Sequence, residues 1–403
     1  MDSHELAGGT VGTTGADVVA GGATAVISES ADDPPDGDIV IRLVDVTKVF
    51  PGTDTPAVGG LSLEMARGEL TALVGPSGCG KSTTLKMINR LLEPTSGEIY
   101  VQGVEIRQQP KHELRRQIGY VIQQIGLFPH RTVAHNIGTV PRLLGWSRAD
   151  IRARTEELAE QVGLAPEMLG RYPGALSGGQ QQRVGVARAL AADPPVLLMD
   201  EPYSAVDPIV RKQLQDDLLA LQHDLHKTIV LVTHDIDEAI KVGDRIVLLN
   251  VGGVLEQVGT PAEVLRSPAN EFVETFLGRE RGLKRMALIT VAEVPLARGP
   301  VLGVDAAAAD AASVMADAGT EWVGVLDGDQ VLGWAWGRDL EGCTLVGDAP
   351  CQPFRAYVHP GTSIREALDN IVNTRTRVAV VLAEDDGRYL GMLTVDELAE
   401  ALE

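Results

Sequence analysis

The chain has 403 residues and a formal net charge of −21, because 56 acidic side chains outnumber 35 basic ones. This length allows two or three domains, and apolar stretches such as Ile246 to Leu249 are far shorter than the ~20 residues of a membrane-spanning helix. An acidic chain lacks the basic face that binds nucleic acids, so we expect no nucleic-acid partner. Three scattered cysteines, and no Lys or Arg before Arg42, favour a cytoplasmic protein without disulfides or a signal peptide.

Residues 1–38 are rich in Gly, Ala, Thr and Ser and contain eight acidic side chains. Such a segment has too little apolar surface to offset the entropy that ordering costs. We therefore expect a disordered acidic tail.

Short apolar runs alternate with helical patterns between residues 39 and 280. Strands separated by helices predict an α/β fold with a mostly parallel sheet covered on both faces. The stretch from about residue 117 to 175 lies between two sheet-forming parts and is predicted to be an inserted helical subdomain. The first helix is expected to start at Lys81. The expected strands are Leu70 to Val74, Val196 to Met199, Ile229 to Val232 and Ile246 to Leu249.

The strand that ends at Val74 is followed by a phosphate-loop pattern, G-x-x-x-x-G-K-S, that opens a helix. Glycines let successive backbone N–H groups surround a phosphate, and the helix N-terminus adds its dipole. Lys81 would reach the β- and γ-phosphate oxygens, and Ser82 would ligate Mg²⁺. A chance glycine-rich turn would not need this strand and helix, so we predict a nucleotide-binding site. Its residues are Gly75, Pro76, Ser77, Gly78, Cys79, Gly80, Lys81, Ser82 and Thr83.

A second apolar strand ends in two carboxylates, Asp200 and Glu201. Strands of one parallel sheet bring their carboxyl ends to the same edge, so both acids should lie beside the phosphate loop. We expect Asp200 to hold Mg²⁺ through water and Glu201 to polarise the attacking water.

Between these two elements lies Leu-Ser-Gly-Gly-Gln, which opens an Ala- and Arg-rich helix. Two glycines at a helix N-terminus again make an anion site. With this string between a phosphate loop and an Asp-Glu strand, residues 39–280 resemble the ATPase subunit of an ATP-binding cassette (ABC) transporter, a P-loop NTPase fold. The residues of this signature are Ser177, Gly178, Gly179 and Gln180.

The resemblance implies further roles. Gln123 matches the glutamine that contacts Mg²⁺ and the attacking water, Asp207 matches the D-loop aspartate, and His234 matches the histidine that contacts the γ-phosphate. Phe50 stands where the family usually has a tyrosine that stacks on adenine. The resemblance also implies a head-to-tail homodimer, in which the signature of one subunit binds the ATP held by the other.

The C-terminal part contains an internal repeat, since residues 332–340 align with 390–398. Each copy has the pattern of a strand-helix-strand-strand-helix unit. Residues 283–403 resemble a tandem of cystathionine-β-synthase-type (CBS) domains, an α+β module, with repeats at 283–340 and 341–403. We expect Trp334 and Trp336 to pack in a core or interface rather than to bind a ligand.

The resemblance implies that this tandem regulates the ATPase. Nucleotide-binding versions carry a hydroxyl and an Asp, whereas the first copy has Trp336 with Asp339 and the second has Thr394 with Glu397. A basic patch that senses ionic strength at anionic lipid is the alternative. Its arginines would be Arg375, Arg377 and Arg388, which could equally be ordinary solvated surface.

A cassette ATPase joined to such a tandem is similar to the ATPases that drive import of glycine betaine, proline, choline and carnitine. The similarity implies integral-membrane permease partners, an extracytoplasmic solute-binding protein reached through the permease, and a place at the cytoplasmic face of the membrane. The loop containing Phe128, Pro129 and His130 would receive a helix of the permease. An importer of another solute, such as an amino acid or metal chelate, remains an alternative. A non-transport cassette ATPase is another alternative, although the long heptads or second phosphate loop of such proteins are missing here.

Overall fold

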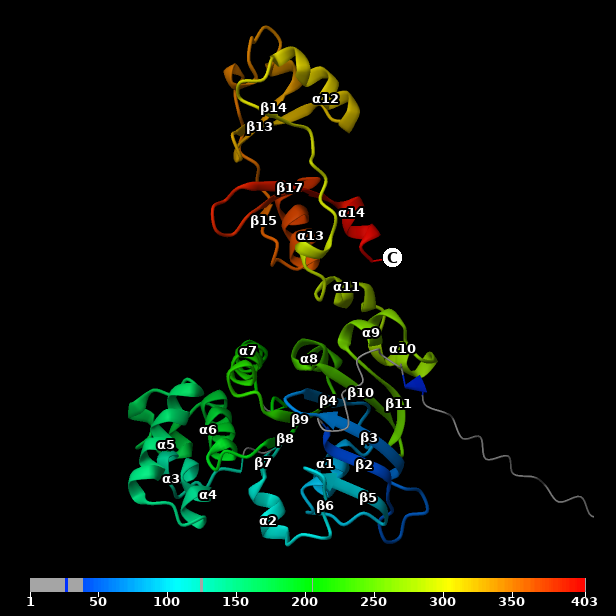
Figure 1. The fold of residues 1–403 in the computed structure, drawn as a ribbon, viewed down its shortest axis with the longest axis vertical. Helices are drawn as coiled ribbons and strands as arrows, with labels where there is room; N and C mark the ends of the chain where they lie inside the picture. Colours follow the sequence, from blue (N-terminus) through cyan, green and yellow to red (C-terminus); the bar gives the residue numbers. More distant parts are fainter. Residues whose placement is uncertain (1–25, 28–38, 124–125, 205, 403) are drawn as a thin grey trace, which may run out of the picture.

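One seven-stranded sheet forms the centre of the protein in the computed structural model, which describes residues 26–27, 39–123, 126–204 and 206–402 (Figure 1). The strand order is β1-β11-β10-β4-β9-β8-β7. Strands β10, β4, β9, β8 and β7 run parallel, as the alternation of apolar runs and helices predicts. The bounds are β1 Val26–Ile27, β4 Leu70–Val74, β7 Ile118–Val121, β8 Val196–Asp200, β9 Thr228–Thr233, β10 Arg245–Asn250 and β11 Val254–Gly259.

A four-stranded antiparallel sheet packs beside the central sheet, with the order β3-β2-β5-β6. Helix α1, Lys81–Ile88, shares one apolar core with both sheets, and its Leu85 and Ile88 are fully buried there. The phosphate loop is thus anchored between two sheets. The bounds are β2 Ile39–Lys48, β3 Val58–Ala66, β5 Ser96–Val101 and β6 Val104–Glu105.

The expected disordered tail is corrected at two residues, because Val26 and Ile27 pair in parallel with Gln257 and Val258 at the edge of the central sheet. Backbone hydrogen bonding with an open edge strand needs no apolar mass from the added segment. The rest of the expected tail lies outside the described residues.

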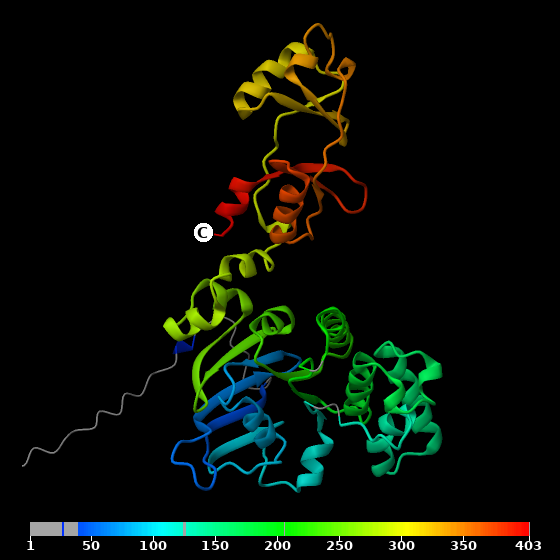
Figure 2. The same ribbon diagram turned by 180° about the vertical axis from the view of Figure 1, so that it is seen from behind.

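A layer of helices stands at the β7 end of the central sheet (Figures 1 and 2). Helices α3 and α5 pack against α6, so the helical subdomain includes α6. The expected start near residue 117 is wrong, because Ile118–Val121 is a strand that pairs with β8. The helices are α2 Lys111–Arg116, α3 Val133–Ile137, α4 Thr139–Leu143, α5 Arg148–Gln161, α6 Gly178–Leu190, α7 Pro208–Leu225 and α8 Ile236–Val242, with short 3-10 turns at Pro166–Met168 and Pro173–Ala175.

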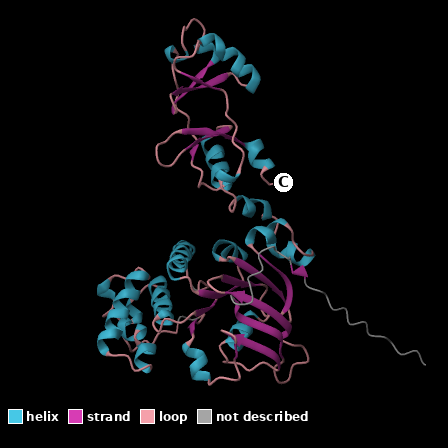
Figure 3. Cartoon of the chain, in the orientation of Figure 1, coloured by secondary structure: helices cyan, strands magenta, loops and turns pink. Residues whose placement is uncertain are grey.

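Helices α9 Pro261–Arg266, α10 Glu271–Leu277 and α11 Arg281–Met286 lead from the sheet to the C-terminal repeats. Each repeat is a three-stranded sheet with helices, as Figure 3 shows. The helix expected after the last strand of the first repeat is only a 3-10 turn, Gly337–Asp339. The elements are β12 Val301–Gly303, α12 Ala311–Ala318, β13 Trp322–Asp327, β14 Gln330–Trp336, β15 Tyr357–Val358, α13 Ile364–Thr374, β16 Val378–Leu382, β17 Tyr389–Thr394 and α14 Val395–Glu400, with 3-10 turns at Val291–Glu293, Ala308–Asp310 and Val346–Asp348.

The sequence boundaries of the repeats do not match their packing. Met286, Val291 and Val294 precede the first repeat's sheet yet belong to the core of the second repeat. Val346 and Ala349 lie in the second stretch of sequence yet belong to the core of the first repeat. The divisions at 283–340 and 341–403 are therefore corrected: each core borrows a segment from the neighbouring stretch of chain.

The two C-terminal sheets share a third core. Trp322 and Trp334 pack there with Phe354, Val380 and Met392. The rings of Trp322 and Phe354 meet edge to face, with centroids 5.7 Å apart. The expected packing role of Trp334 is confirmed, because period-2 alternation turns it to the face opposite Ala335, which belongs to the other core of that sheet.

Candidate active site

The carboxyl ends of three adjacent strands, β4, β9 and β8, carry the predicted chemistry. Val74 pairs with Thr233, and Asp200 pairs with Val232. The phosphate loop, Asp200 and His234 therefore meet at one edge of the sheet.

The phosphate loop has the backbone that its glycines allow. Gly75 has φ of 154° and Gly80 has φ of 96°. A Cβ on Gly75 would lie 2.0 Å from the carbonyl oxygen of Leu249, and one on Gly80 would lie 2.5 Å from that of Ala57. Two walls of backbone thus close on the loop, so only glycine fits at these two positions.

Lys81 is buried and donates hydrogen bonds to the carbonyl oxygens of Gly75 and Pro76, at 2.7 and 2.9 Å. Its ammonium group is thereby held under the loop, within reach of a bound phosphate. Ser77 and Gly78 are exposed, Pro76 and Thr83 are half-buried, and Cys79 is fully buried and fills space beneath the loop.

Ser82 and Asp200 form the contact expected of a cation site. The Ser82 hydroxyl donates to Asp200 Oδ1 at 2.6 Å, and Asp200 is 4% exposed. The Tyr120 hydroxyl lies 3.4 Å from the other carboxylate oxygen. Burial, and next the charge of Asp200, raises the pKa of Tyr120, so this phenol stays a neutral donor.

Glu201 is contacted by both predicted catalytic neighbours. Gln123 Nε2 donates to Glu201 Oε2 at 3.0 Å, and His234 Nδ1 lies 3.4 Å from the same oxygen. Glu201 has φ of 44°, a left-handed conformation that is strained for a side-chain-bearing residue. This turn places the Glu201 carboxylate between Gln123, which follows β7, and His234, which follows β9.

The signature residues form a regular helix start. The Ser177 side chain caps α6 and the Gln180 side chain returns to the Ser177 N–H, at 3.3 and 2.9 Å. Ser177 and Gly178 are exposed, and Gly179 is buried against Val210. In both ribbon views α6 lies with the helical layer, apart from α1.

Two further predicted residues flank the site. Asp207 caps α7 by accepting from the Val210 N–H at 3.1 Å. Phe50 follows β2 and lies under the Lys48 ammonium, 5.4 Å from the ring centroid. The loop that starts at Phe50 returns to Ala57 and Val58, which pack on Gly80.

Sequence reasoning missed two residues. Tyr120, described above, could have been found as a polar ring on a strand next to the acidic one. Asn136 is fully buried; it accepts from the Phe128 N–H and donates to the carbonyl oxygens of Phe128, Arg131 and Thr132, at 2.8 to 3.2 Å. The signal in the sequence is weak: Asn136 is a single polar side chain on the buried side of the short helix α3, beside Val133 and Ile137.

The C-terminal repeats contain a separate cleft of about 520 Å³. Arg375 and Arg377 line it with the three tryptophans of the first repeat, whereas Arg388 is not among its lining residues and lies 3.8 Å from Asp386. The expected three-arginine patch is thus divided. Arg375 also has φ of 56°, so its segment is not extended as the patch required.

The hydroxyl and acid of the second repeat act locally. Thr394 and Glu397 form a capping box at the start of α14, in which the carboxylate accepts from both the Thr394 N–H and its hydroxyl. Both groups are therefore engaged within their own helix turn.

Within the part of the chain that the structure describes, no cluster of three or more His, Cys, Asp or Glu side chains could hold a metal ion, and no helix has the length and apolar character to cross a membrane. A cation at Ser82 would take one hydroxyl, one carboxylate and phosphate oxygens. This is the all-oxygen donor set that Mg²⁺ prefers, so the residues fit the ion.

Comparison with protein families matches both parts of the chain. A family described as "ABC transporter" matches residues 58–204, and one described as "CBS domain" matches residues 346–403.

Curated relatives match across both parts. The glycine betaine/carnitine/choline transport ATP-binding protein of Bacillus subtilis is 51% identical over 370 residues, covering 90% of this chain and 96% of that protein. The osmoprotectant import ATP-binding protein of Salmonella typhimurium is 43% identical over 369 residues, with the same coverage of both chains.

Solved structures match the cassette. A dimeric ATP-binding cassette in a post-hydrolysis state with ADP and Pi is 35% identical, with a TM-score of 0.50 over 55% of this chain and 98% of that one. A component of an ABC transporter complex of Clostridium perfringens is 27% identical, with a TM-score of 0.53 over 62% of this chain and 100% of that one.

Proposed function

Because this chain belongs to the family of ABC transporter ATP-binding subunits, we propose that it drives import of a quaternary-amine osmoprotectant such as glycine betaine, choline, carnitine or proline. The observation that carries this is the 51% identity to a glycine betaine/carnitine/choline transport subunit, which spans cassette and C-terminal repeats alike.

The cassette hydrolyses ATP, and the geometry supports a division of labour among its residues. Lys81 and the N–H groups of the loop bind the phosphates, and Glu201 accepts a proton from the attacking water. Gln123 and His234 contact the Glu201 carboxylate and so orient it toward the phosphate loop. Phe50 is proposed to stack on the adenine.

Mg²⁺ would be held by Ser82, Asp200 and, on the water side, Gln123. When bound it neutralises charge on the phosphate oxygens. In this chain Tyr120 keeps the second oxygen of Asp200 fixed by a hydrogen bond at 3.4 Å.

Two cassettes are proposed to act as a head-to-tail homodimer. Ser177, Gly178, Gly179 and Gln180 stand on α6 with the helical layer, and their exposed N-terminal face suits a phosphate of a second subunit. Asp207 begins the neighbouring helix and would lie at the same contact.

The subunit would sit at the cytoplasmic face of the membrane through permease subunits, with a solute-binding protein on the other side. Phe128 is 37% exposed although Asn136 fixes its backbone, as expected of a rigid apolar contact that a partner covers. Phe128→Ala should leave ATP binding intact and weaken transport. Unchanged transport by the reconstituted complex would contradict this docking role.

The C-terminal tandem is proposed to regulate the ATPase. Arg388 does not line the cleft that Arg375 and Arg377 line, so the three arginines do not form one patch. The test therefore uses separate variants. Arg375→Ala/Arg377→Ala and Arg388→Ala should be compared across a salt series in vesicles with and without anionic lipid. Identical salt profiles in wild type and variants would exclude these arginines as the sensor.

The solute is tested by reconstituting this chain with its permease and solute-binding protein. ATP-dependent uptake of labelled glycine betaine, choline, carnitine and proline should exceed uptake of an unrelated amino acid and a metal chelate. Uptake of only the last two would support the alternative importer and overturn the proposal.

A further inference from the structure

Three of the chain's four tryptophans line the cleft of about 520 Å³ between the two C-terminal repeats. Trp322 lies opposite Trp336 across the β13–β14 pair, and Trp334 stands two residues before Trp336 on the same strand. Because side chains alternate between the two faces of a strand, these three indoles share one face of the sheet and form an aromatic box. All three are half-buried, so each leaves ring surface open to the cleft.

The rings of the aromatic box stand nearly at right angles. The planes of Trp322 and Trp334 differ by 72°, with centroids 6.4 Å apart, and those of Trp334 and Trp336 differ by 81°, with centroids 4.9 Å apart. Walls at right angles suit a compact, rounded group, and the negative faces of the rings attract a cation. A quaternary ammonium has both properties, whereas a flat nucleotide base would stack on one ring face and leave the others unused.

The side of the cleft that the second repeat contributes is basic. Arg355, Arg375 and Arg377 line it, all three are exposed, and no acidic residue of the described chain lines the cleft. Within the described residues, no ion pair or side-chain hydrogen bond engages these guanidinium groups. Guanidinium groups with free donors bind a carboxylate through paired hydrogen bonds.

This positive charge is specific to the second repeat. Arg375 ends α13 in a left-handed conformation, with φ of 56°, whereas the residue that ends α12 in the first repeat is Gly319, with φ of 62°. Two residues further on, Arg377 corresponds to Glu321. A left-handed backbone is costly for a residue that bears a side chain. The repeat fold itself therefore does not require arginine at either position.

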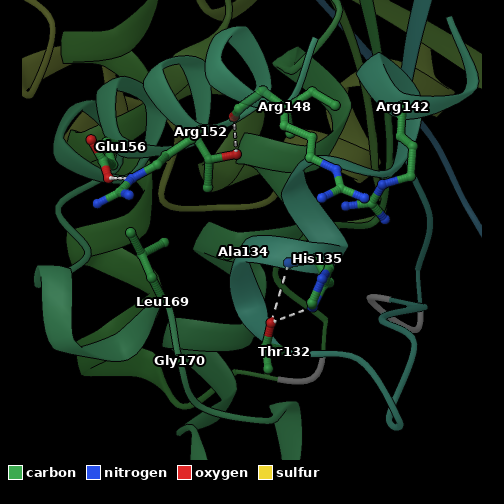
Figure 4. Close-up of a pocket in the computed structure, with 11 residues that line it drawn as sticks. Thr132, Ala134, His135, Arg142, Arg148, Arg152, Glu156, Leu169 and Gly170 are labelled. Atoms are coloured by element: carbon green, nitrogen blue, oxygen red, sulfur yellow. Dashed lines mark hydrogen bonds and ion pairs between the residues drawn. The ribbon is translucent and has the colours of Figure 1, made fainter. Parts of the chain in front are cut away.

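The basic cavity of about 680 Å³ in the helical layer is built differently (Figure 4). Three arginines line it, but Glu156 lies among them, 2.8 Å from Arg152. Its lining residues include no Trp, Tyr or Phe. Arginines alone therefore do not distinguish the C-terminal cleft, whereas free guanidinium groups beside an aromatic box do.

We propose that the C-terminal cleft binds a zwitterion that carries a quaternary ammonium and a carboxylate, such as glycine betaine or carnitine. The ammonium lies in the aromatic box and the carboxylate on Arg375 and Arg377. The chemistry of binding stands on the cleft alone. Only the identity of this ligand with the transported solute rests on the proposed function, and in that case the cleft senses solute that has accumulated beside the ATPase.

The cleft adjoins the segment that connects the repeats to the cassette. Arg375 ends α13, and α13 packs against α11. Helix α11 lies on the path from the central sheet to the repeats. A ligand bound at this end of α13 can therefore act on the connection to the cassette.

The test is ligand binding by the full-length protein without its permease. Tryptophan fluorescence reports on the cleft, and calorimetry gives an independent affinity. Glycine betaine and carnitine should bind saturably, whereas glycine, which has the carboxylate without the methyl groups, should not. Trp336→Ala should weaken glycine betaine binding about tenfold or more, and Trp336→Phe should retain part of it. Trp146→Ala, which removes the tryptophan outside the cleft, is the matched control.

The arginines test the other half of the ligand. Arg375→Ala/Arg377→Ala should weaken binding of glycine betaine about tenfold, and should change binding of choline, which has no carboxylate, much less. Arg388→Ala, outside the cleft, is the control. If Trp336→Ala lowers the melting temperature, the arginine variant decides, because removing exposed side chains leaves no cavity.

Four outcomes are informative. Binding that is lost in Trp336→Ala and lost for glycine betaine alone in the arginine variant supports the proposal. Absence of saturable binding of glycine betaine and carnitine, or binding that neither variant changes, overturns it. Binding of AMP that Trp336→Ala abolishes, without binding of glycine betaine, also overturns it and assigns the cleft to nucleotides. Betaine binding by a chain whose complete transporter imports only another solute supports this inference and refutes the proposed solute.

Discussion

Lys284 Nζ lies 2.8 Å from Asp237 Oδ1, and this ion pair ties the segment that enters the C-terminal repeats to the first turn of the helix after His234. Lys284 is 13% exposed and Asp237 is 68% exposed. Lys284 lies on α11, and this helix also packs against α9 and α13. A displacement of the repeats can therefore reach the residue that contacts Glu201 through one helix.

Breaking this pair should uncouple the repeats from the ATPase. In the reconstituted complex, Lys284→Ala should change the ratio of ATPase rates at low and high salt by at most about fivefold, because a partly exposed pair contributes ~0.2–1 kcal/mol. The swap Lys284→Asp/Asp237→Lys should restore the ratio. Lys241→Ala, which removes a pair between α8 and α7, is the control. A control that behaves like Lys284→Ala would refute the specific route.

Glu201→Gln should slow ATP hydrolysis by ~10² to 10⁴. The amide keeps the size of the side chain but cannot accept a proton, so ATP stays bound and the dimer persists. Sedimentation of this variant with Mg-ATP should give a dimer. A species that remains monomeric under these conditions would argue against the head-to-tail arrangement.

Two adjacent glycines of the signature should respond differently to alanine. A Cβ on Gly178 meets nothing within 4 Å, whereas one on Gly179 lies 2.5 Å from Val210 Cγ1. Gly179→Ala should cost ~1–3 kcal/mol of unfolding free energy through overpacking against α7.

Gly178→Ala should keep full stability, since Ala suits a helix better than Gly, and should weaken ATP-dependent dimerisation by crowding the exposed face. Thermal melts and sedimentation with ATP separate the two effects. Equal melting temperatures for both variants would show that the Val210 contact is not limiting.

Glu238 should make the protein less stable as pH rises. Burial raises the pKa of this carboxyl above its ordinary value, although it accepts from the Thr233 hydroxyl at 2.6 Å. The folded state therefore holds a proton that the unfolded state has released, and stability is lost as pH rises from the unfolded pKa through the folded one.

Glu238→Gln keeps an acceptor for Thr233 and removes the titration. Melting temperatures measured from pH 4.5 to 7.5 should fall more steeply for wild type than for this variant across that window. Parallel curves would mean that Glu238 does not titrate differently on folding.

Much of the site could be predicted from local sequence. The phosphate loop needs glycines because the backbone at Leu249 and Ala57 lies close to it on two sides. Asp200 and Glu201 come at the end of β8, a strand so apolar that it must be buried. The glycine requirement of the loop and the apolar character of the strand both appear within a few residues of sequence. Gly75, Lys81 and Asp200 could therefore be recognised from the sequence alone. The parallel order of the sheet follows from the alternation of strands and helices.

Contacts between residues that are far apart in the sequence were decided only by the tertiary structure. The sequence alone placed a domain boundary near residue 340, whereas Val346 and Ala349 fill the first repeat's core and Met286 fills the second's. Periodicity marks which face of an element is apolar and cannot say which other element covers it. The same reason hid Asn136 and the Lys284 to Asp237 pair: each depends on packing that brings separate elements together.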